Sequence, residues 1–493
     1  MITYFGETMK LLNIKKATAV LLSSLLIPTL ASAALTDDEL ARLGIEGTEL
    51  TPMGAIRAGN AEGTIPAWES TPIKGVPGDH ADSLPDPFAD DKPLFTITAA
   101  NYQEYAEKLT AGQIAMFKQF PETFKMNVYQ TRRTGASDPW VYEATLAQAK
   151  KVRVCDALEA EGRVCMEDHI PGGGIPFPIP KTGVEAAWSN FVSYRGTTMD
   201  KMGNGALVDS NGDRTDVIIR IRQAWPWWLK EDSKIRAKKW FARDEGSLFC
   251  DSWQVEKPPR SSGLVFGGCN YVDKFDFQAY LYVPGQRRVR KAPEIGFHDS
   301  PLFGSDGQRT VTSRFMYYFG GSFLRHDIGK PVKKELFVPY NNYKLTNADT
   351  SFDEIFGEEH VNQDLIRYEL HRVWVIEGTL KKGMRHLYKR HTGYFDEDTW
   401  AGLAYEAYNS KGQLWRVGEQ YNAFIYGPNV TVPVGDIQLD LINGRYTTFP
   451  YSPYQAGKEM GFGGPKIDSS PEDVEKFNVG IFTPQGLRKY GKR

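Results

Sequence analysis

The chain changes its hydrophobic period at about residue 192, and from there to residue 450 apolar and polar positions alternate. A period of two is typical of β-strands that bury one face. The strands that it predicts cover residues 215–228, 274–283, 313–323, 368–378, 386–396, 400–409, 414–427 and 436–449. Turn dipeptides such as Pro284-Gly285 and Lys411-Gly412 separate several of them. Because such short connections require antiparallel neighbours, we expect one large antiparallel sheet.

Apolar residues recur at helical spacing in the part of the chain that precedes the sheet. Thr98 is a suitable N-cap for the first predicted helix, and Asp138 followed by Pro139 is a suitable start for the second. The predicted helices cover residues 98–120, 138–152 and 181–191. Helices followed by an antiparallel sheet make an α+β fold.

The expected organisation is a signal peptide followed by a single domain over residues 34–493. Pro and Gly are frequent before residue 98, which favours an extended arm over regular structure. The parts of the domain are an arm over 34–97, a helical lid segment over 98–191, the sheet over 192–450 and a packed C-terminal tail over 451–493.

A strip of glycine and proline, GGGIPFPIP over residues 172–180, joins the second and third predicted helices. Ile175, Phe177 and Ile179 alternate with prolines, which gives an extended segment with an apolar edge and few N–H donors. A phosphate-binding loop needs those donors, so this function is excluded for the strip. We expect a glycine joint, an apolar strip and the following helix to close one side of a groove.

Three helices are a modest cover for so many strands, which indicates a partly open cavity against the apolar face of the sheet. Aromatic residues make up 13% of the chain, and aromatic side chains often line ligand sites. The candidate ligand-binding residues are Trp225, Trp227, Trp228, Phe275, Phe277 and Leu281, with Phe177 and Ile179 from the strip. The alternative for each of them is a place in an ordinary filled core.

The N-terminus has the pattern of a secretory signal peptide. Lys10, Lys15 and Lys16 precede an apolar run over 17–30, and Ala31-Ser32-Ala33 follows. The run is shorter than the roughly 20 apolar residues of a membrane-spanning helix. We therefore expect cleavage after Ala33 and a periplasmic protein that does not span the membrane.

Charge and cysteine content agree with export. Without the first 33 residues the chain has 56 basic and 60 acidic residues, which argues against nucleic acid as a partner. Its four cysteines can pair in three ways, and the two local pairs, Cys155–Cys165 and Cys250–Cys269, are expected in an oxidising compartment. No CxxC pair supports the alternative of a metal site.

The motifs of common active sites are absent from the sequence. Neither HExxH nor GxSxG occurs, so we expect no catalytic residues, no metal and no cofactor. The acidic run 396–398 is interpreted as a solvated turn. A basic cluster at Arg287, Arg288, Arg290 and Lys291 is either a solvated strand end or a patch for anionic headgroups or an acidic partner.

Two stretches resemble periplasmic outer-membrane lipoprotein-sorting proteins of the LolA/LolB-like superfamily. They are AYLYVPGQRRVRKAP over 279–293 and SPLFGSDGQ over 300–308. The arm ELTPMGAIRAGNAEGTIPAW over 49–68 and the strip GGIPFPIPKTGVEAAW over 173–188 resemble a longer-chained periplasmic family of unknown function allied to that superfamily.

The resemblance implies a curved antiparallel half-barrel whose concave face is covered by helices and holds a hydrophobic ligand. It also implies a carrier that moves a lipid, an acyl chain or another apolar compound between the inner and outer membranes. An inner-membrane exporter and an outer-membrane β-protein are the partners it implies. The alternatives are a non-catalytic scaffold that links envelope transport proteins and, third, an enzyme acting on envelope substrates.

Overall fold

The computed structural model describes most of the chain after residue 33. The described residues are 34–78, 82–155, 166–230, 247–271, 278–292, 305, 307–310, 315–316, 325–451, 453–471 and 478–491. Contacts between residues divide the chain into Met1–Ala31 and a compact unit over Ser32–Arg493. The expected signal peptide lies outside the described residues, and the fold below is that of the second unit.

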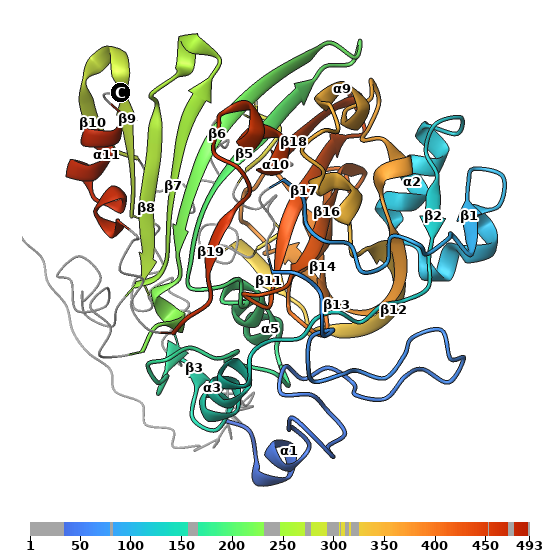
Figure 1. Cartoon of the computed structure of the whole chain (residues 1–493). Helices are drawn as coiled ribbons and strands as arrows, with labels where there is room; N and C mark the ends of the chain where they lie inside the picture. The colour runs from blue at the N-terminus through green and yellow to red at the C-terminus, as the bar shows by residue number, and fades with distance from the viewer. Residues whose placement is uncertain are drawn as a thin grey trace, which may run out of the picture. The chain divides into compact units, whose positions relative to one another are not determined.

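A large, mostly antiparallel sheet dominates this unit (Figure 1). Its long strands are β5 (Thr198–Val208), β6 (Arg214–Ala224), β7 (Ser247–Lys257), β8 (Val265–Tyr271), β9 (Gln278–Val283), β12 (Val332–Pro339), β13 (Tyr368–Leu380), β14 (Arg390–Asp396), β15 (Gly402–Tyr408), β16 (Leu414–Ile425), β17 (Val430–Asp440) and β18 (Arg445–Tyr451). The short strands are β1 (Phe95–Ile97), β2 (Met126–Val128), β10 (Arg288–Lys291), β11 (His326–Ile328) and β19 (Lys466–Asp468).

Strand pairing follows the chain with one long return. Consecutive strands pair from β5 through β10, and again from β13 through β18. β18 then pairs with β5 and joins the two halves, while β11 and β12 pair with the far side of β13. The sheet does not close into a barrel, since its outer strands, β10 and β12, do not pair with each other among the described residues. The expected α+β class with a large antiparallel sheet is confirmed.

Four long strands, β5, β7, β8 and β12, were not predicted from the alternation of residue types. β5 and β7 are buried at nearly every position, on both faces. A strand covered on both sides does not alternate between apolar and polar residues, so the pattern of period two is lost. The predicted strand over 436–449 is in fact two strands, because the chain turns back through Gly444 at a φ of 70°.

The α-helices of the described residues are α1 (Asp37–Ala41), α2 (Ala111–Gln119), α3 (Pro139–Ala149), α5 (Gly183–Phe191), α9 (Phe352–Ile355), α10 (Pro453–Glu459) and α11 (Pro484–Tyr490). Two short strands, β3 (Arg153–Val154) and β4 (Met166–Glu167), pair with each other outside the large sheet. The prediction of a single helix over 98–120 is wrong. This segment contains two helices, a 3-10 helix, η1 (Tyr102–Lys108), and α2. Thr110 starts α2 anew, because its hydroxyl accepts from the N–H of Gln113 at 3.1 Å and its N–H donates to Gln113 Oε1 at 3.0 Å.

Helices α2 and α5 pack directly on the sheet, α2 on β15 and β16 and α5 on β13. The glycines before α5 have a packing role. Gly173 and Gly174 have φ values of 84° and 105°, and a Cβ on Gly173 would lie 2.4 Å from the Trp228 ring. Only glycine tolerates that conformation with a neighbour so close. Among the described residues, no helix combines the length and the apolar character that crossing a membrane requires.

Candidate ligand cleft

The tryptophans proposed as ligand-binding residues lie in the main core of the unit. Trp225, Trp227 and Trp228 are almost completely buried. The Trp227 indole donates to the carbonyl of Gly174 at 3.0 Å, and that of Trp228 donates to Val192 at 2.9 Å. Indole N–H groups satisfied in this way are typical of core tryptophans. Their role in ligand binding stays a prediction.

The remaining candidates have different surroundings. Phe177 is buried in the same core, and Ile179 is half-buried beside the cluster of Leu43 and Leu50. Leu281 is half-buried on β9, whereas Phe275 and Phe277 lie outside the described residues. On the other face of β9, Tyr282 is buried against Leu487 of α11.

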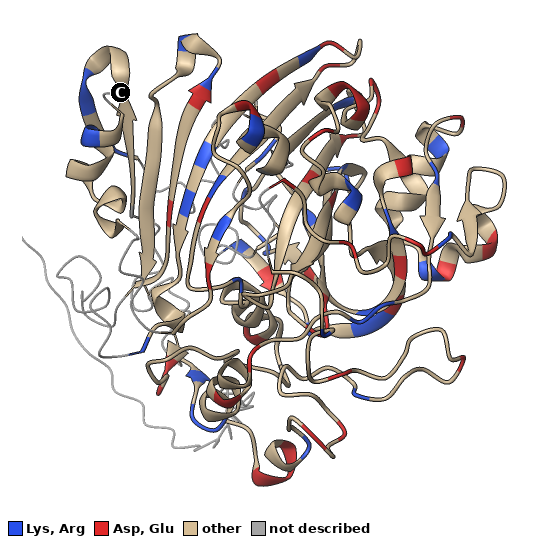
Figure 2. Ribbon diagram, viewed as in Figure 1, with Lys and Arg blue, Asp and Glu red and all other residues tan. Residues whose placement is uncertain are grey.

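The basic cluster is exposed on β10 and the turn before it. Arg287, Arg288, Arg290 and Lys291 have no ion-pair partner among the described residues, and α11 places two further exposed cations, Arg488 and Lys489, beside them. Figure 2 shows Lys and Arg positions, in blue, gathered on the β9–β10 hairpin.

The structure joins Cys250 on β7 to Cys269 on β8 by a disulfide, which is the expected local pairing. Cys155 is also disulfide-bonded. Its expected partner, Cys165, lies outside the described residues.

A cleft of about 780 Å³ lies away from all of these residues, between η1, the β1–β2 hairpin and the β12 side of the sheet. That volume falls within the roughly 300–1,000 Å³ of ligand pockets. Its apolar lining is Leu94, Phe95, Tyr105, Val128, Tyr129, Phe337 and Leu370, and its polar lining includes Thr64, Gln103, Glu104, Glu107, Lys108, Gln130 and Thr131. Figure 1 shows β1, β2 and α2 beside the half of the sheet that contains β12 and β16.

Three aromatic rings form a rigid apolar wall of the cleft. Phe95 stacks on Tyr105 with ring centroids 5.1 Å apart, and Phe337 meets both rings edge-on at 5.9 and 6.1 Å. Beside them, Leu94 is 66% exposed and also lines the cleft. The wall therefore offers apolar surface that no described residue covers.

A second wall, residues 128–131, is bound to the start of β13. The N–H of Tyr129 donates to the Tyr368 carbonyl at 2.8 Å, and the Thr131 hydroxyl donates to the Leu370 carbonyl at 2.8 Å. Arg367 extends this contact by donating to the Gln130 carbonyl at 2.9 Å. These bonds fix the position of this wall relative to β13.

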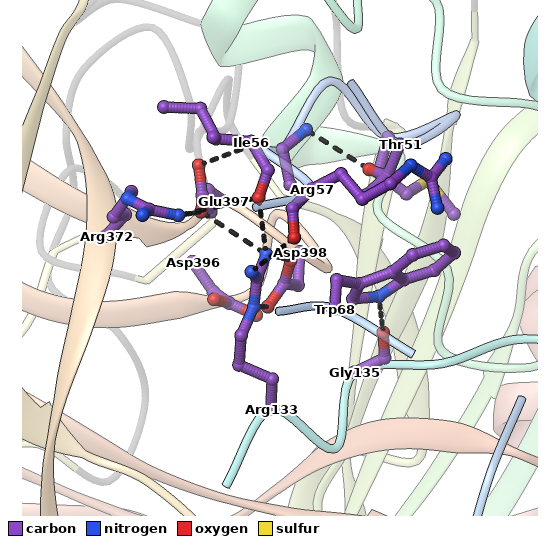
Figure 3. A network of polar contacts seen from close by, with 12 residues as sticks. Thr51, Ile56, Arg57, Trp68, Arg133, Gly135, Arg372, Asp396, Glu397 and Asp398 are labelled. Atoms are coloured by element: carbon purple, nitrogen blue, oxygen red, sulfur yellow. Dashed lines mark hydrogen bonds and ion pairs between the residues drawn. The ribbon is translucent and has the colours of Figure 1, made fainter. Parts of the chain in front are cut away.

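The third wall, which includes Thr64 and Pro66, belongs to the N-terminal arm and is held by a buried arginine. Arg133 donates to the carbonyls of Ile56 at 3.0 Å and Pro66 at 3.2 Å. Figure 3 shows its guanidinium pointing at Asp398, to which it donates two bonds, at 2.6 and 3.0 Å. One side chain thus ties the arm to the turn after β14.

The acidic run 396–398 is not the solvated turn that was expected from the sequence. Asp396, Glu397 and Asp398 are all buried. Glu397 pairs with Lys333 at 2.9 Å and with Arg133 and Arg372, both at 3.4 Å. These cations come from segments far away in the sequence, so nothing local could reveal that the turn is buried.

The buried charges in this cluster raise the pKa values of an arginine and of a carboxyl group. Burial on its own would lower the pKa of Arg133, but the nearby carboxylates, chiefly Asp398, outweigh burial and raise it. Burial and the charge of Asp398 raise the pKa of Asp396 to about 6. Asp396 therefore binds a proton at a higher pH than an ordinary aspartate does.

His371, Asp396 and Asp398 could in principle hold a metal ion, because their ligand atoms lie within 4.8 Å of one another. Arg133, however, already binds both oxygens of Asp398 and supplies the positive charge that a metal would bring. His371 Nε2 lies 3.0 Å from Glu369. This donor set fits an ion-pair cluster that supports the arm better than it fits a metal centre.

A buried glutamate supports the aromatic wall from behind. Gln113 of α2 donates to the Phe337 carbonyl at 3.0 Å and to Glu419 Oε1 at 2.9 Å. Tyr368 donates to the other oxygen of Glu419 at 2.8 Å. Burial raises the pKa of Glu419 to about 7, although both hydrogen bonds oppose the increase.

Sequence reasoning missed the cleft because its walls come from distant parts of the chain. They span Gly63 to Leu370, and no single segment contributes more than six lining residues. One local signal was available, the run PLFTI over 93–97, in which Leu94 and Phe95 are adjacent and so cannot point to the same side of a strand.

Comparison with known proteins gives a family. The family model described as "Protein of unknown function (DUF1329)" matches residues 96–488. An uncharacterized protein of Pseudomonas aeruginosa is 38% identical over 444 residues, which cover 89% of this chain and 92% of that protein. The expectation of a family of unknown function is confirmed.

Two solved structures are similar at low identity. A DUF1329 family protein from Desulfovibrio piger has 13% identity and a TM-score of 0.37, covering 62% of this chain and 97% of that one. A LolA superfamily protein from Nitrosomonas europaea has 12% identity and a TM-score of 0.30, covering 61% and 94%. Since the family model spans most of the residues after the arm and the Pseudomonas relative is matched over nearly its whole length, the chain belongs to the DUF1329 family.

Proposed function

We propose that this protein is a periplasmic carrier that holds a hydrophobic ligand and transfers it between the inner and outer membranes. The observation that carries the proposal is the cleft of about 780 Å³, whose aromatic wall and exposed Leu94 leave apolar surface that no described residue covers. The ligand class is a lipid, an acyl chain or another apolar compound.

The energetics of apolar burial support this function. Covering about 200–300 Å² of apolar ligand surface, at about 25 cal/mol per Å², stabilises the complex by roughly 5–8 kcal/mol before the cost of association. The polar lining, with Glu104, Glu107 and Lys108 on η1, would keep a ligand's polar end towards water. The basic cluster from Arg287 to Lys291 is the proposed contact for an anionic headgroup or an acidic transport partner.

The test is to identify what the protein carries and where. Protein purified from the periplasm is analysed by native mass spectrometry and lipid extraction, and binding of a fluorescent fatty acid is measured by titration. We expect an apolar ligand in the extract and a saturable signal. If neither is found, the carrier function is rejected.

Variants at exposed cleft positions place the site without disturbing the core. Ala106 is exposed on η1 and lines the cleft, so Ala106→Trp should fill it and weaken binding at least tenfold. Leu94→Glu should weaken binding through loss of apolar contact. Leu281→Ser is the matched test of the groove expected from the sequence. A loss of binding in that variant alone would move the site from the cleft to the sheet.

A further inference from the structure

The loop between β13 and β14, residues 381–389, carries two large apolar side chains in solvent. Met384 is 49% exposed and Leu387 is 43% exposed. Only six large apolar residues are this exposed in the described part of the chain, and two of them lie three positions apart in this loop. Single exposed apolar residues are ordinary, but a pair at the tip of one loop indicates an interaction surface.

Positive charge surrounds this apolar pair. The segment KKGMRHLYKR over 381–390 contains five cations and no acidic residue, in a chain whose net charge is −2. Arg390 pairs with Glu377 at 2.6 Å. The other exposed cations of the loop, Lys382, Arg385 and Lys389, have no ion-pair partner in the part of the chain that the structure describes.

The loop is firmly held, so its apolar side chains are presented outward by the fold. Tyr388 is fully buried, and its hydroxyl accepts from Arg416 at 2.8 Å. At the other end, the N–H of Lys381 donates to the Arg325 carbonyl at 2.8 Å, and the N–H of Met384 closes a turn onto Lys381 at 3.1 Å. Gly383 permits that turn with a φ of 84°.

We propose that residues 381–389 are a membrane-contact loop that binds the surface of a bilayer containing anionic phospholipid. Met384 and Leu387 enter the interface between headgroups and acyl chains, and Lys382, Arg385 and Lys389 bind lipid phosphates. Apolar side chains flanked by lysine and arginine are the combination that such an interface favours. An acidic protein surface would complement the cations but would leave the two apolar side chains without an apolar partner.

This inference goes beyond the proposed carrier function and is separable from it. The loop follows β13 at Leu380, while the cleft lies near Leu370, about 33 Å away along an extended strand. Ligand binding in the cleft can be measured without vesicles, so failure of one proposal leaves the other intact.

Vesicle co-sedimentation tests the loop. The experiment is done at physiological salt, where the Debye length is about 8 Å. We expect the purified protein to bind vesicles of 30% phosphatidylglycerol in phosphatidylcholine and not vesicles of phosphatidylcholine alone. Each cation near an anionic membrane strengthens binding roughly fivefold. The triple variant Lys382→Gln, Arg385→Gln and Lys389→Gln should therefore bind these vesicles about 100-fold more weakly. Met384→Ser with Leu387→Ser should weaken it at least about fivefold.

The matched control removes the same charge from exposed sites elsewhere, with Lys74→Gln, Lys92→Gln and Lys150→Gln. It should bind within about twofold of the unchanged protein, because dispersed cations do not act together at one contact. If the loop variant and the control bind equally, or if the unchanged protein ignores the anionic vesicles, the proposal is overturned.

A local probe reports insertion directly. Leu387→Cys, labelled with an environment-sensitive fluorophore, should shift its emission to the blue on vesicle binding, and no cysteine among the described residues is free to compete for the label. Ile73→Cys, at an apolar residue that is 45% exposed in the N-terminal arm, should not shift. If the label at position 387 keeps its emission wavelength in water when vesicles are added, or if the loop binds only an acidic protein, the proposed binding to a lipid surface is rejected.

Discussion

Arg133 should be the side chain whose loss most disturbs the arm and the cleft together. It is buried with Asp398 and Glu397, and its guanidinium also donates to the carbonyls of Ile56 and Pro66. Arg133→Met keeps the length and the apolar volume of the side chain and removes the charge and all of these bonds.

The structure sets the size of the effect. Glu397 keeps Lys333 at 2.9 Å, but Asp398 loses both bonds that the guanidinium gives it and becomes a buried carboxylate without a counter-charge. Breaking a buried ion pair costs roughly 3–5 kcal/mol. The carbonyls of Ile56 and Pro66 also lose a donor, but neither residue is buried, so this loss adds little. We therefore expect Arg133→Met to lower the free energy of unfolding by about 3–5 kcal/mol.

Urea unfolding at pH 7.5, followed by circular dichroism, measures that loss. The double variant Arg133→Met with Asp398→Asn removes the orphaned charge and should recover about 2 kcal/mol or more relative to additivity. Arg42→Met, which breaks an exposed pair with Glu49, is the control and should change stability little. Additive effects in the double variant, or a loss below about 1 kcal/mol in Arg133→Met, would refute the reasoning.

Two further predictions concern a proton and a backbone conformation. Burial raises the pKa of Glu419 from an ordinary 4.5 to about 7, so the folded state holds a proton that the unfolded chain releases, and stability should fall by ~3 kcal/mol as the pH rises from 4.5 to 7. Glu419→Gln should remove this part of the decrease in stability with pH, and at pH 8 the variant should be more stable than the unchanged protein in urea unfolding. A variant with the same pH dependence as the unchanged protein would contradict this. Gly173→Ala should cost about 2–4 kcal/mol, because alanine meets both the positive φ and the Trp228 ring. Gly412→Ala, with a φ of 79° and open space around it, should cost only about 1–2 kcal/mol, and equal losses in thermal unfolding would rule out the steric contribution.

Local signals in the sequence were sufficient for part of the second half of the sheet and for two helices. The runs predicted as strands include β13, β14, β15 and β16, and the turn at Lys411-Gly412 joins β15 to β16. Pro139 begins α3 and Thr182 caps α5 through Glu185. Periodicity, capping and turn chemistry act between residues a few positions apart, so one chain suffices to read them.

The tertiary structure decided which charges are buried and where a ligand could bind. The acidic run 396–398 looks solvated in the sequence, yet Arg133, 265 residues before Asp398, covers it. The cleft likewise needs the arm, η1, β2 and β13 to meet. Burial and cavity shape depend on which distant segments pack together, and a single sequence carries no local record of those contacts.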